Sequence, residues 1–404
     1  MKQKLILIVQ LAALVALFVL IALLPSGPGA IASSAAHADA LTAQAAVGRK
    51  MFFDSRLSNP QGMSCATCHD PRQGWGGNNA ATGGVAAGAL PGARGIRNTP
   101  TIGYAGYIPA FRLKNFRGET LGVGGLFWDG RANTLEEQAR GPLFGKAEMN
   151  LADDAELAAR LRLAPYAAEL RAAFSLPDHA DDVQWVTAAI SGLAAFERSP
   201  EVAPFSSKYD AWLRGQTPLS DAEARGLKLF ADRKKANCIA CHVIDPASKA
   251  SVDHLFTNFS YVNLGLPRNA AIDENKDSHW FDLGLCGPAR KRPQGSFIAC
   301  GAFKVPTLRN VAKRPFLFHN GGFTRLDEAV RFYVERNTHP ERWYSRSDDG
   351  KLAKFDDLPQ RYTGNVRHGE PPYDTKIGKK PHLSGTEIAD VIAFLKTLDD
   401  GFQP

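Results

Sequence analysis

Apolar residues recur at helical spacing in short segments of this chain, and polar or Gly/Pro-rich stretches separate them. The pattern predicts short amphipathic helices over residues 48–52, 134–140, 190–196, 226–230, 328–334 and 388–394. Thr217-Pro-Leu-Ser220 is a start signal for the helix that leads to residue 226, with Asp221 and Glu223 in its first turn. Residues 74–95 are Gly-rich and show no regular period, which predicts a loop. The fold class is therefore expected to be mainly α, with long loops.

The segments form two series with the same internal order. Residues 127–139, which read FWDGRANTLEEQA, align without a gap on residues 318–330, at a constant offset of 191. Such self-similarity indicates a duplicated unit. We therefore expect two tandem domains, residues 41–210 and 211–404, with two insertions in the second copy at 253–300 and 337–380.

Residues 1–40 have the pattern of an export segment. Lys2 and Lys4 precede an apolar run over residues 5–24, and two A-x-A-like cleavage sites follow, at residues 36–38 and 38–40. The run is also long enough to span a bilayer, so a cleaved signal peptide and a retained membrane anchor both remain open. In either case, we expect the rest of the chain to lie outside the cytoplasm, in the periplasm.

The net charge bears on the kind of partner molecule, and the cysteine content bears on a possible disulfide. The chain of 404 residues has a formal net charge of +7 and no Lys/Arg run, which argues against nucleic acid and mildly favours acidic protein partners. Two of the six cysteines, Cys286 and Cys300, lie outside any motif. An exported chain could join them in a disulfide worth about 3 kcal/mol, and two free thiols are the alternative.

Two C-x-x-C-H motifs carry the chemistry: Cys65-Ala-Thr-Cys68-His69 and Cys238-Ile-Ala-Cys241-His242. In c-type haem attachment the two thiols bond the vinyl groups of the porphyrin, and the adjacent His binds iron from the proximal side. A thioredoxin-like redox pair does not require the His. A four-Cys zinc site normally needs its pairs much closer than the 173 residues that separate these motifs. The sequence therefore predicts two covalently bound c-type haems.

The distal side of the first haem has few candidate ligands in its own copy. No His occurs between His69 and His179, and Met149 is the only Met in that interval. Because the distal ligand decides between electron transfer and chemistry, this favours an open sixth position for peroxide or water. Ligation by Met149 is the alternative.

The second haem differs, because none of the four Met residues lies in the second copy. Tyr333 follows His319 by 14 residues and stands opposite Pro142 in the repeat, where proline cannot bind iron but a phenolate can. The alternative is that Tyr333 is a packed aromatic residue of the helix at 328–334. The candidate distal ligands are therefore a Tyr or one of His254, His279, His319, His339, His368 and His382.

In combination these motifs resemble the bacterial di-haem cytochrome c peroxidase/MauG family over essentially all of residues 41–404. The resemblance rests on the two C-x-x-C-H motifs, on FWDGRANTLEEQARGPLFGKAEM, and on FKVPTLRN followed by FHNGG. It implies two cytochrome-c-like domains, with peroxide reacting at haem 1 and electrons passing through haem 2.

The resemblance also implies roles for individual residues. Trp128 matches the tryptophan between the haems, and Gln138 and Glu148 match the residues that line the peroxide pocket. Without the resemblance, Trp128 would be read as core, Gln138 as a polar helix face and Glu148 as a solvated helix-end charge. A carboxylate above the iron can move a proton between the peroxide oxygens, and desolvation should raise its pKa. A calcium ion is implied at Asn98 and at the backbone carbonyls of Arg314 and Phe316.

Two departures point to the MauG-like subgroup. The sequence lacks the His that blocks haem 1 in typical members, and it has Tyr333 where they have a Met on haem 2. MauG-like proteins use peroxide to oxidise residues of another protein, but the Trp that MauG has before its second motif is replaced here by Ala236-Asn237. We therefore expect a peroxide-dependent oxidase of a protein substrate. A peroxidase with a small cytochrome or copper-protein donor and a di-haem electron carrier are the alternatives.

Overall fold

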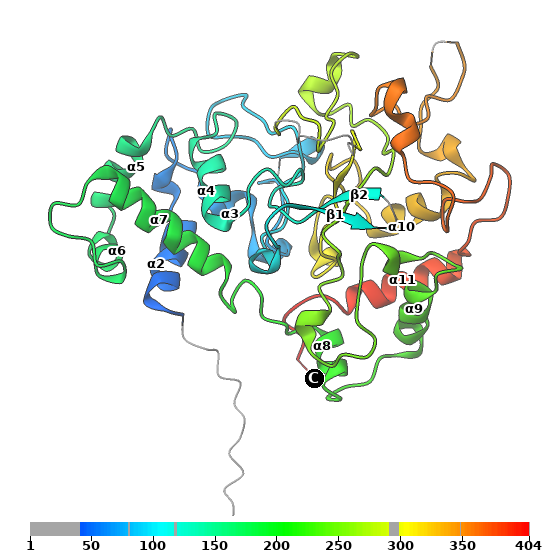
Figure 1. Cartoon of the computed structure of the whole chain (residues 1–404), viewed down its shortest axis with the longest axis horizontal. Coiled ribbons are helices and arrows are strands. Elements are labelled where there is room, and N and C mark those ends of the chain that lie inside the picture. The colour runs from blue at the N-terminus through cyan, green and yellow to red at the C-terminus, as the bar shows by residue number, and fades with distance from the viewer. Residues whose placement is uncertain (1–40, 80, 117–118, 291–298, 348, 404) are drawn as a thin grey trace, which may run out of the picture. The chain divides into compact units, whose positions relative to one another are not determined.

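The predicted helices form in the computed structural model, which describes residues 41–79, 81–116, 119–290, 299–347 and 349–403. The predicted export segment, residues 1–40, lies outside the described residues. In the described part, no helix combines the length and apolarity that a membrane span needs. The helices are α2 (Ala43–Phe52), α3 (Cys65–Cys68), α4 (Leu135–Phe144), α5 (Asp154–Arg162), α6 (Ala167–Ala173), α7 (Asp182–Glu197), α8 (Lys208–Leu213), α9 (Asp221–Ala231), α10 (Leu326–Glu335) and α11 (Gly385–Lys396). The prediction of a mainly α fold is confirmed (Figure 1).

Two helix pairs repeat one packing arrangement, α2 with α7 and α9 with α11 (Figure 1). A Cβ atom added to Gly48 would lie 1.8 Å from the carbonyl oxygen of Gly192, and one added to Gly226 would lie 2.0 Å from that of Asp390. Glycine is therefore needed at both crossings, because any side chain would collide with the facing backbone. The two glycines occupy equivalent places in the sequence repeat.

Each helix pair belongs to its own hydrophobic core. Phe52 packs on Phe196 in the first core, with ring centroids 5.2 Å apart, and Phe230 packs on Phe394 in the second, at 5.3 Å. The first core runs from Val47 to Val202 and the second from Tyr209 to Leu398. Residues 41–404 nevertheless form one unit, so the predicted domain boundary near residue 210 stays a prediction.

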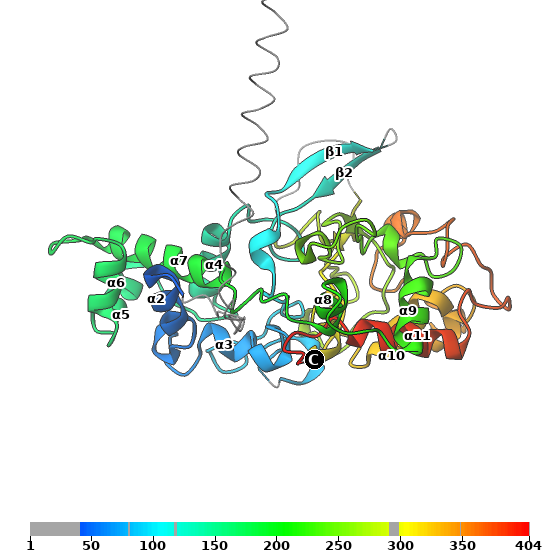
Figure 2. The same cartoon turned by 90° about the horizontal axis from the view of Figure 1, so that it is seen from below.

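Strands are few and short. The strands are β1 (Arg112–Phe116), β2 (Glu119–Val123), β3 (Tyr261–Val262) and β4 (Phe303–Lys304), in the antiparallel pairs β1–β2 and β3–β4. In β1–β2 the register pairs Arg112 with Val123, and this hairpin projects from the helices in Figure 2. A bridge from Val123 to Ser260 joins the hairpin of the first copy to the second.

The irregular segments also follow the sequence pattern. Residues 74–95 contain only one 3-10 turn, at Thr82–Gly84, among their described positions. Ser220 caps α9 by a reciprocal capping box with Glu223, as the start signal predicts. Cys286 and Cys300 form a disulfide, with their Cα atoms 5.2 Å apart, which decides the alternative that the sequence left open.

Candidate functional site

Both C-x-x-C-H motifs present their His in the same way. His69 follows helix α3, and its Nδ1 lies 3.2 Å from the carbonyl oxygen of Trp75. His242 follows a 3-10 turn, and its Nδ1 lies 2.9 Å from the carbonyl oxygen of Phe256. An Nδ1–H that donates to a carbonyl fixes the tautomer and leaves the Nε2 lone pair free for a metal.

The two carbonyl groups are held by matching backbone geometry. Trp75 and Phe256 both adopt positive φ angles, 61° and 54°. Thr101 and Thr307 each donate a hydrogen bond, of 2.7 and 2.6 Å, to the carbonyl that precedes these residues. Left-handed backbone is costly for aromatic residues, so its repetition beside both His residues marks a functional constraint.

The residues present fit two covalently attached haems. Cys65, Cys68, Cys238 and Cys241 are not joined in disulfides. Burial lowers the pKa of both His69 and His242 to about 4, which keeps the imidazoles neutral at physiological pH. Neutral imidazole is the form that binds iron.

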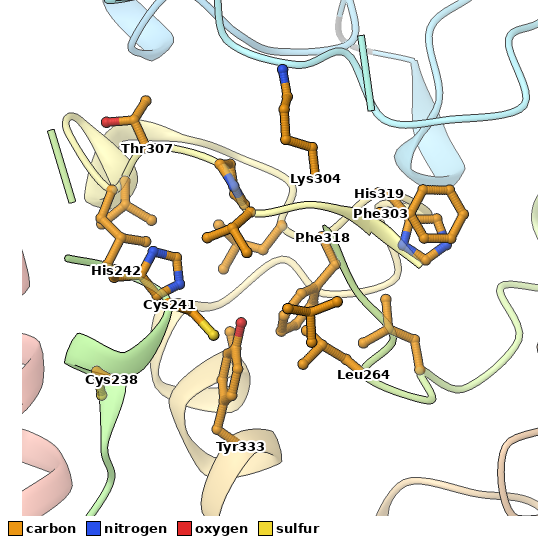
Figure 3. A pocket seen from close by; sticks show the side chains of 18 of the residues that line it. Cys238, Cys241, His242, Leu264, Phe303, Lys304, Thr307, Phe318, His319 and Tyr333 are labelled. Atoms are coloured by element: carbon orange, nitrogen blue, oxygen red, sulfur yellow. The ribbon is translucent and has the colours of Figure 1, made fainter. Parts of the chain in front are cut away.

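A cavity of about 220 Å³ opens beside the second motif. Its lining includes Cys238, Cys241 and His242 on one side and Tyr333 from α10 on another. Figure 3 shows the phenol of Tyr333 pointing into the same space as the His242 ring. The structure therefore brings together the four residues that the sequence assigns to haem 2, although iron ligation by Tyr333 stays a prediction.

The other candidate ligands of haem 2 are less well placed. Both ring nitrogens of His254 lie within hydrogen-bond distance of other groups, Tyr209 and the Ser248 carbonyl. His319 lines the cavity, but its ring stacks on Phe303, at the end away from His242 (Figure 3). The remaining four, which are not among the residues that line this cavity, are His279, His339, His368 and His382.

Tyr333 lies in an aromatic and basic environment. Its ring centroid is 5.7 Å from that of Phe318 and 6.4 Å from that of Tyr373. Burial raises the pKa of Tyr333 far above its usual value, and the nearby charge of Arg336 acts in the opposite direction. Without a cation bound to its oxygen, Tyr333 is therefore a neutral phenol.

Gln138 and Glu148 belong to α4 and to the turn that follows it. Thr134 caps this helix by accepting a hydrogen bond from the backbone N–H of Glu137. Glu148 lies close enough to the first motif for its charge to act with burial in raising the pKa of Cys68 to about 12. Surrounding protein atoms raise the pKa of Glu148 itself, as a proton-transfer residue requires, although the side chain remains accessible.

The Gly-rich loop holds the turn that carries Glu148. The backbone N–H of Ala89 donates to the carbonyl of Glu148 at 2.7 Å. A Cβ atom on Gly88 would lie 2.4 Å from the carbonyl oxygen of Ala147, so this approach needs glycine. The loop thus fixes the backbone of the candidate acid/base.

Met149, the alternative ligand of haem 1, is 3% exposed and belongs to the first hydrophobic core. His179, the first His after His69, is exposed at the surface. The structure leaves the choice between Met149 and an open position as the sequence had it.

Trp128 connects the two copies of the repeat. Its indole N–H donates to the carbonyl oxygen of Asn98 at 2.7 Å, and the side chain borders the haem 2 cavity. The backbone N–H of Asn98 in turn donates to the carbonyl of His319, from the second copy. This position between the motifs suits the predicted role of Trp128 as a relay between the haems.

The predicted calcium ligands meet only in part. The Asn98 amide nitrogen donates to the carbonyl oxygens of Phe316, at 3.1 Å, and of Phe318, at 2.9 Å. A calcium ion would need the amide oxygen on that side, and the two orientations of an Asn amide are nearly isosteric. No cluster of three or more His, Cys, Asp or Glu side chains suited to a metal occurs among the described residues. The calcium site, including the Arg314 carbonyl, stays a prediction.

Three buried residues of the second copy were missed by sequence reasoning. Lys304 donates to the carbonyl of Gly125 at 2.8 Å, and burial lowers its pKa to about 7. Arg336 and Tyr373 lie beside Tyr333. Tyr373 lies in an insertion without a repeat partner, and no pattern distinguishes a buried Arg from an exposed one.

The chain is similar to known di-haem proteins in sequence. The family model of the di-haem cytochrome c peroxidases matches residues 42–218. A methylamine utilization protein MauG from Paracoccus denitrificans is 36% identical over 369 residues, which cover 89% of each chain. A cytochrome c551 peroxidase of Pseudomonas aeruginosa is 29% identical over 71% of this chain and 70% of its own length.

Solved structures show the same likeness. The diheme peroxidase BthA from Burkholderia thailandensis superposes with a TM-score of 0.81 at 38% identity, covering 88% of this chain and 86% of its own. A MauG-like protein associated with microbial copper homeostasis gives a TM-score of 0.60 at 28% identity, covering 89% of each chain.

Proposed function

The chain belongs to the di-haem cytochrome c peroxidase family, and from this membership we propose that it reduces hydrogen peroxide at haem 1 with electrons drawn through haem 2 from a protein substrate, which is oxidatively modified. Family membership implies two c-type haems and an oxidoreductase that uses peroxide. The protein substrate and its modification are the part that we propose.

Haem 1 supplies a ferric iron at which peroxide can bind. With haem 1 bound, Glu148 would accept a proton from one peroxide oxygen and return it to the other, so that the second oxygen could leave as water while the haems supply two electrons. The raised pKa of Glu148 suits this exchange, because the group must both take up and release a proton. Gln138, which lies on α4 before the turn that carries Glu148, would orient the peroxide by hydrogen bonds.

The observation that carries the proposal is the asymmetry between the two copies. Tyr333 faces the cavity of the second motif, where the first copy has Pro142 inside α4. With haem 2 bound, an anionic Tyr333 oxygen would stabilise oxidised iron and help it to retain an oxidising equivalent. Trp128 would relay charge between the haems.

Electrons enter at the surface beside the second motif. The hollow there is lined by Ile239, Val243 and Ile244 and by Arg233, Arg367 and Glu370, of which Arg367 and Glu370 form a salt bridge. The lining therefore has a small excess of positive charge, which suits the acidic face of a partner protein, because opposite charges steer the encounter. Turnover with a protein donor should therefore slow as ionic strength rises.

We also propose the location and the calcium ion that the sequence suggested. The Cys286–Cys300 disulfide supports an oxidising compartment, which fits export to the periplasm by residues 1–40. Calcium binding at Asn98 and at the Arg314 and Phe316 carbonyls is supported by the meeting of Asn98 with Phe316. Metal analysis of the purified holoprotein tests it.

Resting-state electron paramagnetic resonance of the ferric holoprotein tests the asymmetry directly. We expect one high-spin haem that reacts with peroxide and a second haem whose signal changes in Y333F. Two low-spin haems that ignore peroxide would instead indicate an electron carrier.

A second function, peroxide removal with a small electron donor, has the likeness to the cytochrome c551 peroxidase in its favour. The two are separated by supplying peroxide with either reduced cytochrome c or a co-purified protein. Fast oxidation of the cytochrome without new modifications on the protein would favour the second function. A mass change of the protein that requires peroxide would favour the first.

A further inference from the structure

Arg314 brings a positive charge with an unpaired N–H group into the haem 2 cavity. The residue follows the 3-10 turn Val311–Lys313, and it belongs to the cavity lining. Its Nη2 donates to the backbone carbonyl oxygen of Arg309 at 2.7 Å. Its Nε is buried and has no hydrogen-bond partner in the described part of the chain. Because a buried N–H group without an acceptor is costly, the folded chain leaves this side chain short of one acceptor.

Two further buried arginines show how the chain compensates such a group elsewhere. Arg309 forms a salt bridge with Asp210 in which both side chains are fully buried. Arg336 forms no salt bridge with a described residue, but it lies outside the cavity lining, and each of its three guanidinium nitrogens donates to an oxygen atom. Arg314 differs from both, because it combines an unpaired nitrogen with a place in the lining.

The acidic side chains of the cavity lining are not available to Arg314. Asp282 and Glu370 each form a salt bridge with another arginine. Burial raises the pKa of Asp357 to about 8, so this carboxyl is mostly protonated at neutral pH. Among the described residues, the lining therefore offers Arg314 no free carboxylate.

Lys304 is the other cation of the lining that forms no salt bridge with a described residue. Its ammonium group donates to the carbonyl oxygen of Gly125 at 2.8 Å, and in Figure 3 it points toward the first copy, away from His242 and Tyr333. Burial lowers the pKa of Lys304 to about 7, whereas a guanidinium keeps its charge at neutral pH. Arg314 is therefore the cation of this cavity that lacks an anion.

Outside the lining, Asp399 is the acidic group that acts electrostatically on Arg314. No salt bridge joins the two side chains, which are both among the described residues, and the Oδ1 atom of Asp399 is itself buried without a hydrogen-bond partner. Asp399 is therefore the protein group that competes with any other anion for Arg314.

We propose that Arg314 binds a propionate of haem 2. A haem carries two propionate side chains, and a planar guanidinium can pair with a carboxylate through two parallel N–H···O bonds. Such a contact supplies the acceptor and the negative charge that the folded chain leaves out. The inference needs haem 2, which family membership implies, but it needs neither Tyr333 as an iron ligand nor a protein substrate.

Resonance Raman spectroscopy of the ferric holoprotein tests the contact, because the bending vibration of a haem propionate shifts when its hydrogen bonds change. In R314Q, which lacks the charge and the guanidinium fork, one propionate band should shift from its wild-type position. K313Q is the matched control, since Lys313 is the preceding residue, donates to the Asp400 carbonyl at 2.7 Å and lies outside the lining. Unchanged bands in R314Q, or the same shift in K313Q, would overturn the proposal.

The reduction potential of haem 2 gives a second readout. A positive charge beside a propionate disfavours ferric iron, so its removal should make haem 2 harder to reduce. In R314Q the equilibrium constant for reduction should fall roughly 10-fold, which is about 59 mV for one electron. R314K keeps the charge, and K313Q keeps Arg314, so both should stay within about threefold of the wild type. A potentiometric titration of the holoproteins measures these values, and an R314Q value within about threefold of the wild type contradicts the proposal, as does a K313Q value that falls as far as that of R314Q.

Denaturant unfolding of the holoproteins separates a propionate from Asp399 as the partner of Arg314. If Asp399 were the partner, D399N would recover most of the stability that R314Q loses. We expect instead that the two losses add, and recovery of more than half of the R314Q loss would overturn the proposal. If R314Q does not mature with both haems, R314K decides, because a lysine lacks the fork and should still shift a propionate band. Unchanged bands in R314K would then contradict the contact.

Discussion

Single side chains make the two halves of this duplicated protein chemically different. Glu148 follows α4 in the first copy, and Tyr333 lies within α10 in the second. Nearby protein atoms raise both pKa values, but the consequences differ. A raised pKa makes a carboxyl a better proton acceptor and donor in turn, whereas a buried phenol stays protonated until a cation binds its oxygen.

Replacing the Glu148 carboxyl should slow the reaction with peroxide. E148Q keeps the shape but cannot accept a proton, so we expect the oxidised species to form about 100-fold more slowly or worse. In the wild type the rate should fall as pH drops through the raised pKa of Glu148, because only the carboxylate accepts a proton, and E148Q should lack this dependence. Stopped-flow mixing with peroxide between pH 5 and 8 measures both.

The control is Glu169 on α6, which is exposed and paired with Lys50. E169Q removes a carboxylate away from the first motif and should react at the wild-type rate. An E148Q variant that matches E169Q would remove Glu148 from the proton-transfer role.

At the scale of elements, both copies of the repeat contain the same pair of crossed helices. Gly48 and Gly226 allow α2 and α9 to touch the backbones of α7 and α11. The close approach lets the Phe residues of each pair meet behind the haem motif. Each haem motif therefore packs on an equivalent helix pair, although the loops around the two motifs differ.

A methyl group at either crossing should destabilise the fold. In G226A the new Cβ would lie 2.0 Å from the carbonyl oxygen of Asp390, so the helices must separate, at a cost of about 1–3 kcal/mol or more. Denaturant unfolding of the holoprotein measures the change. G385A is the matched control, because a Cβ there meets no atom within 4 Å, and it should leave the stability unchanged or slightly raised. Equal stabilities for the two variants would contradict the packing argument.

At the scale of the whole molecule, a buried ionic cluster joins the first copy to an insertion of the second. Arg97 donates to Asp129, beside Trp128, at 2.8 Å and to Asp282 at 2.5 Å. Burial acts to raise the pKa of Asp129, but its two arginine partners outweigh this and lower it. The cluster therefore stabilises the fold above the ordinary Asp pKa, and this contribution is lost as pH falls through the lowered value.

Breaking this cluster should loosen the connection between the copies. D282N removes one negative charge from Arg97 and should lower the free energy of unfolding by about 2–3 kcal/mol. The exposed pair of Asp273 with Lys276 offers a control, and D273N should leave the stability nearly unchanged. Denaturant unfolding of both holoproteins at pH 7 measures the two changes in the free energy of unfolding. Equal changes would mean that the cluster contributes no more than a surface pair.

Much of the fold could be predicted from local patterns. Five of the six predicted helical segments lie wholly in helices, and the sixth, residues 134–140, begins at the N-cap of α4, because amphipathic spacing is a property of neighbouring residues. The haem-attachment motifs and the mainly α class could also be predicted, since both depend on residues that are close together in the sequence. The ends of the helices were predicted less well. For example, α2 begins five residues before its predicted segment.

The surroundings of the sites were decided by tertiary structure alone. The sequence offered seven candidate ligands for haem 2, and only the fold placed Tyr333 in the same cavity as His242 while the ring nitrogens of His254 met other groups. The burial of Arg336 was likewise invisible in the sequence, because whether a cation is buried depends on segments far apart in the chain. Local sequence thus determined which groups can bind haem and exchange protons, and long-range packing decided which of them meet.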